Sequence, residues 1–76
     1  MYSTTWCGYC RRLKIQLAGA AIEFREVDVD LDEEAAEFVI TANGGDRTVP
    51  LIEFPDGSTL TNPSLAQVQE RLAAAA

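Results

Sequence analysis

Hydrophobic residues recur along the chain at two different spacings, and these spacings predict an alternation of strands and helices. Residues 2–5 are rich in Tyr and Thr and favour a short strand. Apolar residues three to four positions apart then predict a helix over residues 7–18, with Gly19 as its stop. The buried positions expected for this helix are Cys10, Leu13 and Leu17. Alternating apolar residues predict a second strand over residues 21–29, where a change of parity indicates a bulge.

The second half of the chain continues the alternation. Residues 32–41 are predicted to form a helix, because acidic residues crowd its first turn and Asn43-Gly44-Gly45 follows its end. The buried stripe of this helix is expected at Ala35, Phe38, Val39 and Ala42. Strands are predicted at residues 49–54 and 58–60, and the Asp56-Gly57 pair between them is typical of a tight hairpin turn.

A third helix is predicted to open with Asn62 as its N-cap and Pro63 at its first helical position. The residues expected to face the core from this helix are Leu65, Val68 and Leu72. The resulting order, βαβαββα, implies an α/β fold in which a mixed four-stranded sheet is covered by three helices. No linker or internal repeat interrupts this order, so we expect one domain over residues 1–76.

The chain has 76 residues, two cysteines and no histidine, which limits how its small core could be reinforced. A bond between Cys7 and Cys10 would close a very short loop and contribute only about 2 kcal/mol in the chain-entropy model. A structural zinc site normally needs four Cys or His ligands, so no metal site is expected. The two sulfurs are therefore better suited to chemistry than to stabilisation.

Acidic residues outnumber basic residues by twelve to six, which gives a formal net charge of −6. This balance argues against a nucleic-acid or anionic-membrane partner. No apolar run approaches the roughly 20 residues of a membrane span, and residues 1–6 lack the basic and apolar regions of a secretory signal. We therefore expect a reducing, cytoplasmic location, where disulfides are usually transient and catalytic.

The Cys7-Gly8-Tyr9-Cys10 motif lies where the first predicted strand passes into the first predicted helix. Residues three apart in a first helical turn have Cβ atoms about 5–6 Å apart, so a small adjustment allows a disulfide. Cys7 would lie at the helix N-terminus, where unpaired N–H groups and the helix dipole stabilise a thiolate. Cys10 follows one turn later on the apolar stripe. These positions predict that Cys7 is the nucleophile and Cys10 the resolving thiol.

Charged and aromatic residues flank this motif. Arg11, Arg12 and Lys14 could place positive potential around the thiolate and attract an anionic thiol substrate, or could form a solvated basic face. Trp6 is expected to be partly buried by packing, whereas Tyr9 could present its ring to a thiol substrate. The acidic residues that follow are interpreted as a solvated face and a helix cap rather than a metal site. They are Glu26, Asp28, Asp30, Asp32, Glu33, Glu34 and Glu37.

The segment Trp6-Cys7-Gly8-Tyr9-Cys10, followed later by Thr48-Val49-Pro50, resembles the active-site pattern of glutaredoxins in the thioredoxin superfamily. The resemblance covers nearly the whole chain. It implies the thioredoxin/glutaredoxin fold, a cis Val49–Pro50 bond beside Cys7, and pairing of the Val49 backbone with the extended thiol-peptide part of a substrate. Glutathione-using glutaredoxins have a Gly-Gly-Cys-Asp-Asp-like turn before the last helix, whereas residues 60–64 here contain neither glycine nor acid.

Residues 43–50 and 56–64 instead resemble the corresponding segments of mycoredoxins, the mycothiol-dependent relatives of glutaredoxins. This resemblance implies a monomeric thiol–disulfide oxidoreductase that reduces mycothiolated or disulfide-bonded proteins, with mycothiol as co-substrate and no bound cofactor. Cys7 would attack the mixed disulfide, and a second mycothiol or Cys10 would then free it. The residues that the resemblance implies for substrate binding are Trp6, Gly8, Tyr9, Arg11, Thr48, Val49, Pro50, Thr61 and Asn62.

Three other functions fit parts of this pattern. A dithiol redoxin that donates electrons to ribonucleotide reductase would need Cys10 in every turnover. A glutaredoxin that holds an iron–sulfur cluster between two protomers would use Cys7 and a bound thiol, because glycine follows the first cysteine. A non-redox binding module on the same fold would leave both cysteines idle.

Overall fold

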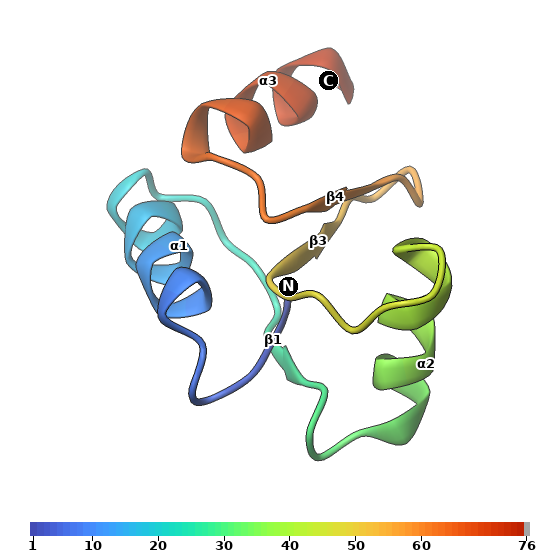
Figure 1. The fold of residues 1–76 in the computed structure, drawn as a ribbon. Helices are drawn as coiled ribbons and strands as arrows, with labels where there is room; N and C mark the ends of the chain where they lie inside the picture. Colours follow the sequence, from blue (N-terminus) through green and yellow to red (C-terminus); the bar gives the residue numbers. More distant parts are fainter. Residues whose placement is uncertain (76) are drawn as a thin grey trace.

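The computed structural model describes residues 1–75 and contains four short strands and three helices in the predicted order. Along the chain the elements are β1 (Tyr2–Ser3), α1 (Gly8–Gly19), β2 (Val27–Asp28), α2 (Glu33–Ala42), β3 (Leu51–Glu53), β4 (Thr59–Thr61) and α3 (Leu65–Ala75) (Figure 1). The predicted α/β architecture, with a mixed four-stranded sheet and three helices, is confirmed. Over residues 1–75, no helix combines the length and the apolar character needed to cross a membrane.

The sheet has the strand order β2-β1-β3-β4. β1 runs parallel to β2, with Tyr2 opposite Val27, and antiparallel to β3, with Tyr2 opposite Leu51. β3 and β4 form the predicted hairpin, in which Gly57 has a positive φ of 87°. Because β1 is central and leads directly toward α1, the sheet fixes the point at which the Cys7 motif begins.

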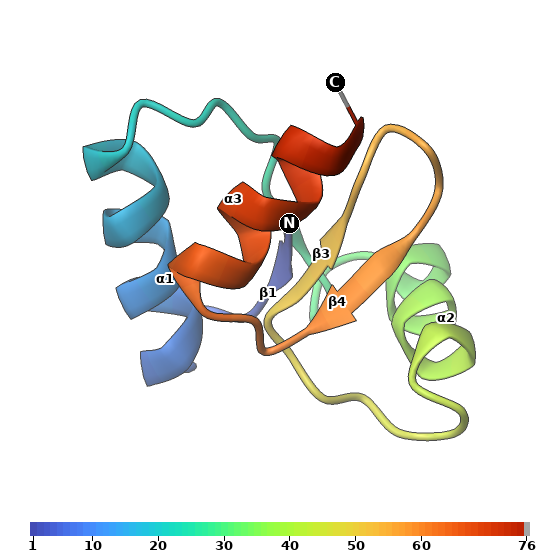
Figure 2. The ribbon, with the colours of Figure 1, turned by 90° about the horizontal axis from the view of Figure 1, so that it is seen from above.

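The helices lie on both faces of the sheet. α1 and α3 cover one face and α2 covers the other, as two perpendicular views show (Figures 1 and 2). The core on the α1 and α3 side consists of Met1, Cys7, Cys10, Leu13, Leu17, Ile52, Phe54 and Val68. The core on the α2 side consists of Val29, Ala35, Val39 and Leu51. Both cysteines of the motif therefore belong to one packed layer, which restricts their movement.

Several details of the predicted elements are wrong, and the strands are in general shorter than predicted. The second strand covers only Val27–Asp28 rather than residues 21–29, because β1 offers ladder partners through Tyr2 and Ser3 alone. Ala21 has a left-handed φ of 58°, which ends the helical turn instead of starting a strand. In α2, Ala42 is exposed rather than buried, since it is the last residue of the helix.

The start of α3 is also different from the prediction. The helix begins at Leu65, and Ser64 rather than Asn62 caps it. The Ser64 Oγ accepts a hydrogen bond from the Gln67 N–H at 3.1 Å, and the Gln67 side chain accepts one from the Ser64 N–H at 2.8 Å. This is a capping box. Asn62 instead takes a left-handed φ of 46°, and Pro63 is buried before the helix.

Candidate active site

Cys7 is the N-cap of α1, with the extended backbone that an N-cap requires. Its Sγ accepts a hydrogen bond from the Cys10 N–H at 3.1 Å, so it occupies the place that a serine or aspartate oxygen usually takes at a helix start. The helix dipole and this N–H both favour negative charge on the sulfur. Gly8 follows, and a Cβ built on it meets no atom within 4 Å, so the chain leaves open space beside the motif.

Cys10 lies in a different environment, although both thiols are free. Its exposed fraction is 2%, against 8% for Cys7. Burial, together with the side-chain hydrogen bond to Cys7, raises the pKa of the Cys10 thiol to about 12. Cys10 is therefore protonated at neutral pH, and this asymmetry favours the predicted division of roles between the two sulfurs.

A loop from the other half of the chain faces Cys7. The Val49–Pro50 peptide bond is cis, as the resemblance implied, and the Cys7 thiol donates to the Val49 carbonyl at an S···O distance of 3.9 Å. Asn43 holds this loop, because its Nδ2 donates to the Asp46 carbonyl at 3.3 Å and to the Thr48 carbonyl at 2.9 Å. The loop therefore presents its backbone beside the sulfur in a fixed shape.

Thr61 and Asn62 lie in different surroundings despite being neighbours. The Thr61 hydroxyl donates to the Asn43 side chain, so Thr61 supports the loop that faces Cys7. Asn62 is exposed and lines a groove of about 340 Å³ between the starts of α1 and α3. The groove is lined by Tyr9, Arg12, Leu13, Gln16, Asn62, Pro63, Ser64, Leu65 and Gln67. No local pattern along the chain indicated that Arg12 and Gln16 would line the same groove as Asn62.

The prediction that Trp6 would be partly buried is wrong. Its exposed fraction is 74%, and its indole N–H donates to Asp30 Oδ2 at 2.9 Å. Arg47 forms an ion pair with Asp30 at 3.6 Å, so one carboxylate joins Trp6 to the loop that contains Val49. Tyr9 is also exposed, at 66%. Trp6 and Tyr9, which flank Cys7 in the sequence, therefore both expose aromatic rings that a docking substrate could contact.

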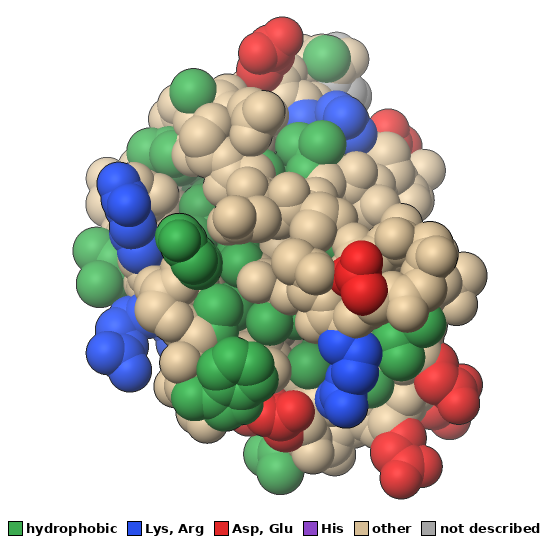
Figure 3. All heavy atoms as spheres, in the orientation of Figure 1, with side chains coloured by type: hydrophobic (Ala, Val, Ile, Leu, Met, Phe, Trp, Pro, Cys, Tyr) green, Lys and Arg blue, Asp and Glu red, His purple; other side chains and the backbone are tan. Residues whose placement is uncertain are grey.

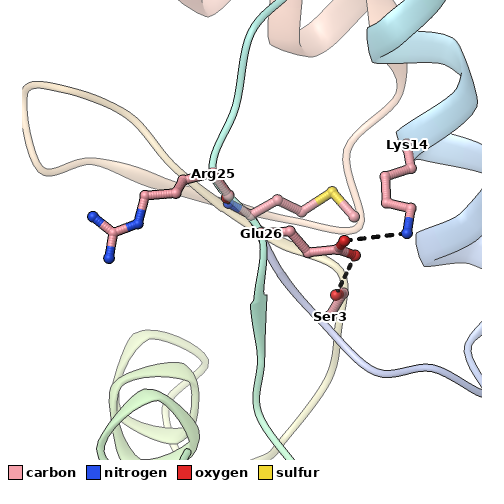
Figure 4. Close-up of polar contacts among 5 residues, drawn as sticks. Ser3, Lys14, Arg25 and Glu26 are labelled. Atoms are coloured by element: carbon pink, nitrogen blue, oxygen red, sulfur yellow. Dashed lines mark hydrogen bonds and ion pairs between the residues drawn. The ribbon is translucent and has the colours of Figure 1, made fainter.

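Arg11 does not line the groove between α1 and α3 but lies in the wall of a smaller cavity behind the two cysteines. Lys14 also lines this cavity and pairs with Glu26 at 3.1 Å, while Ser3 donates to the same carboxylate at 2.7 Å (Figure 4). Glu26 therefore makes specific contacts rather than belonging to a simple solvated acidic face. The sequence offered no local signal for this cluster, because its members come from β1, α1 and the segment before β2.

The charges of the site are distributed unevenly over the surface. On the face shown in Figure 3, basic side chains lie over α1 but also near the top and the lower centre, and acidic side chains lie over α2 and at scattered places elsewhere, with hydrophobic side chains between these charges. Among residues 1–75, no three His, Cys, Asp or Glu side chains converge as metal ligands would. The chemistry that this arrangement offers is that of one activated sulfur beside an exposed apolar surface.

Comparisons with known proteins agree with this geometry. The sequence profile of the family described as glutaredoxin matches residues 1–58. A Mycobacterium tuberculosis protein named as a glutaredoxin is 54% identical over 72 residues, which cover 95% of this chain and 86% of that protein. Mycoredoxin 1 of Corynebacterium glutamicum is 45% identical over 76 residues, which cover 100% of this chain and 94% of that protein.

Proposed function

Because this chain belongs to the glutaredoxin family and is a thiol–disulfide oxidoreductase, we propose that it reduces mixed disulfides between proteins and mycothiol. The observation that supports the proposal most strongly is the difference between its two sulfurs. Cys7 caps a helix and receives an N–H hydrogen bond, whereas Cys10 is more deeply buried and its pKa is raised. This arrangement favours Cys7 over Cys10 as the attacking sulfur.

The first step is an exchange of sulfur partners. The Cys7 thiolate attacks the mycothiol sulfur of the mixed disulfide, and the bond between that sulfur and the protein breaks. The protein leaves as a thiolate and takes up a proton from water, while Cys7 remains joined to mycothiol. A second mycothiol thiolate then attacks the mycothiol sulfur on Cys7, which leaves mycothiol disulfide and restores the Cys7 thiolate.

The surroundings of Cys7 suit an extended substrate. The Val49 backbone lies beside the sulfur, where it would pair with a substrate segment that carries the disulfide. The exposed rings of Trp6 and Tyr9 would cover the apolar part of such a segment. Thr48 and Pro50 would contribute to substrate binding by shaping the loop that Asn43 maintains, rather than by contacting the substrate with long side chains.

The groove beyond Tyr9 supports mycothiol as the small thiol. Mycothiol is a cysteine derivative attached to neutral sugar groups, whereas glutathione has two carboxylates. The groove offers hydroxyl and amide groups from Gln16, Asn62 and Ser64, which suit a polyhydroxylated ligand. The capping box between Ser64 and Gln67 uses N–H groups at the start of α3 that could otherwise hold a carboxylate.

A relative named mycoredoxin adds support, since Mycoredoxin 1 of Corynebacterium glutamicum aligns along the whole of this chain. We also infer that the protein works in a reducing cytoplasm, where its own cysteines stay reduced between turnovers, and that it acts as a monomer. The mixed disulfide itself is the substrate, so the reaction needs neither a metal nor a nucleotide.

The experiment is a side-by-side turnover assay with mycothiol and glutathione mixed disulfides of one peptide. We expect kcat/KM to be at least tenfold higher for the mycothiol substrate. Gln16→Ala should raise KM for that substrate severalfold, because it removes a groove amide. Gln69→Ala, an exposed helical glutamine outside the groove, is the matched control. Equal activity with both thiols would contradict the assignment to mycothiol while leaving a glutaredoxin activity.

A further inference from the structure

A polar cavity of about 200 Å³ lies behind the two cysteines, on the side away from the groove. Both sulfurs line it, together with Thr4, Lys14 and Glu26. A volume of this size accommodates several water molecules, each of which occupies about 30 Å³ in the liquid. The wall is polar enough to bind them. The reaction proposed above, in which Cys7 alone exchanges partners, makes no use of this cavity.

One wall group indicates that the cavity takes up water. Thr4 has an exposed fraction of 8%, and its Oγ1 is the one buried side-chain oxygen or nitrogen without a hydrogen-bond partner in the described part of the chain. A buried hydroxyl without a partner is destabilising unless water satisfies it. Water in the cavity would satisfy it and would also reach the Cys10 thiol, which lines the same space.

Glu26 supplies a negative charge to this cavity. The hydrogen bond from Ser3, at 2.7 Å, holds the pKa of the Glu26 carboxyl below its usual range, and the contact with Lys14 at 3.1 Å acts in the same direction. Glu26 is therefore ionised at neutral pH and is too weak a base to remove a proton from Cys10. The other charged or titratable groups around Glu26 and Cys10 are Cys7, Arg11, Asp28 and the N-terminal ammonium of Met1.

We propose that the Glu26–Lys14 pair at the cavity wall sets how fast Cys10 resolves a mixed disulfide on Cys7. Resolution must first create a negative charge on the Cys10 sulfur, which lines the same cavity as the partly exposed carboxylate of Glu26. Glu26 opposes that charge and slows the step, whereas Lys14 favours it. The pair would thereby favour release of Cys7 by a second small thiol over formation of the internal disulfide. The inference rests on the proposed function, because it assumes that a mixed disulfide forms on Cys7.

The step balances without an added oxidant or reductant. The Cys10 thiol loses its proton to water in the cavity, and the resulting thiolate attacks the Cys7 sulfur. The Cys7–Cys10 disulfide forms as the bond between Cys7 and the small thiol breaks. The small thiol leaves as a thiolate and takes up a proton from water.

The test uses a chromogenic disulfide, so that it does not depend on mycothiol. Reduced protein is mixed with 5,5′-dithiobis(2-nitrobenzoate) in a stopped-flow instrument. Attack by Cys7 releases a first coloured thiolate, and resolution by Cys10 releases a second. If the wild-type protein gives no first release, Cys7 is not a reactive nucleophile and the proposed function itself fails. If the first release is normal and the rate of the second release is the same in every variant, only the inference is overturned and the proposed function stands.

Glu26→Gln should speed the second release about threefold at neutral pH, and Lys14→Gln should slow it by a similar factor. The change is small because Glu26 and Lys14 are partly exposed, so that solvent screens their charges, and because a less basic thiolate is also a weaker nucleophile. Glu26→Asp keeps the charge and should restore most of the wild-type rate. The pH profile of the second release should move to lower pH in Glu26→Gln, which a merely structural contact would not cause.

Matched controls come from the same segment of the chain. Glu23→Gln and Arg25→Gln make the same charge changes outside this cavity, and Figure 4 shows the Arg25 side chain directed away from Glu26 and Lys14. Neither control should change the second release. A slower second release in Glu26→Gln would overturn the inference, because it would identify Glu26 as a proton acceptor. A change of the same sign in Glu26→Gln and Lys14→Gln would also overturn it.

Discussion

The difference between the two cysteines can be measured by alkylation of single-cysteine variants with iodoacetamide at pH 7. Cys7 is the only thiol in the Cys10→Ser variant, and Cys10 is the only thiol in the Cys7→Ser variant. Burial is the largest cause of the raised pKa of Cys10, and it persists when the Cys7 sulfur is replaced. We therefore expect Cys10→Ser to react readily and Cys7→Ser to react slowly.

The magnitude follows from the pKa and the reactivity of thiolates. A rise in the Cys10 pKa from 9.0 to about 12 reduces its thiolate fraction at neutral pH by about a thousandfold. The more basic thiolate is intrinsically more nucleophilic, which recovers a factor of about thirty. Two causes of this rise come from the Cys7 sulfur and are absent in Cys7→Ser, so the pKa slows Cys10 in this variant by at most about thirtyfold relative to an unperturbed cysteine, and its burial slows it further.

The assay is the rate of carbamidomethylation, followed by intact mass. Each variant is measured folded and in concentrated urea, where Cys10 should react at the rate of a free cysteine. That denatured sample controls for the intrinsic reactivity of each thiol. Equal alkylation rates of the two folded variants would show that burial and capping do not divide the roles of the two sulfurs.

Three further predictions test the surroundings of the site. As pH rises from 9 toward 12, the free energy of unfolding should fall, because the folded state retains the Cys10 proton that the unfolded chain releases. In urea titrations, the free energy of unfolding of Cys10→Ser should depend less on pH over this range. Ser64→Ala should lower the free energy of unfolding by about 1 kcal/mol through loss of the α3 cap. Ser64→Gly should lower it by only a few tenths of that, and equal losses in the two variants would argue against capping. Asp30→Ala should release the indole of Trp6, the only tryptophan, and lower its fluorescence anisotropy; an unchanged value would show that Asp30 does not hold the ring.

The sequence was most informative where structure depends on neighbours along the chain. Apolar spacing in α1 and the hairpin turn at Asp56-Gly57 are local patterns, and both predictions are confirmed. The position of Cys7 at a helix start was also predictable, because a strand-like segment and a helical one meet there. These features place the reactive sulfur without any knowledge of distant contacts.

The sequence was least informative where the outcome depends on residues far apart. The second strand was predicted too long because its length is set by pairing with β1, which no local pattern reveals. Asn62 and Ser64 are both residue types that cap helices well. Ser64 caps α3, because Asn62 adopts a left-handed φ where the chain turns back from β4. Trp6 was predicted to be partly buried, but Asp30, 24 residues away, holds it in solvent.

The parts of the candidate site also differ in how far the sequence could predict them. The motif around Cys7 and the loop before Pro50 could be predicted through a family resemblance. The cavity behind the motif could not, because Glu26 meets Lys14 across 12 positions and Ser3 across 23. Side chains that appear in the sequence as members of separate basic and acidic stretches form one ion pair in the fold.

The most direct test of the account is the turnover of a mycothiol–peptide mixed disulfide by the wild-type protein, Cys7→Ser and Cys10→Ser, with excess mycothiol and a system that reduces mycothiol disulfide. Because Cys7 is the prepared nucleophile and a second mycothiol can release it, Cys10→Ser should retain most of the wild-type rate. Cys7→Ser should have no activity above background. Loss of activity in both variants would contradict the account and favour a dithiol redoxin that needs Cys10 in every turnover.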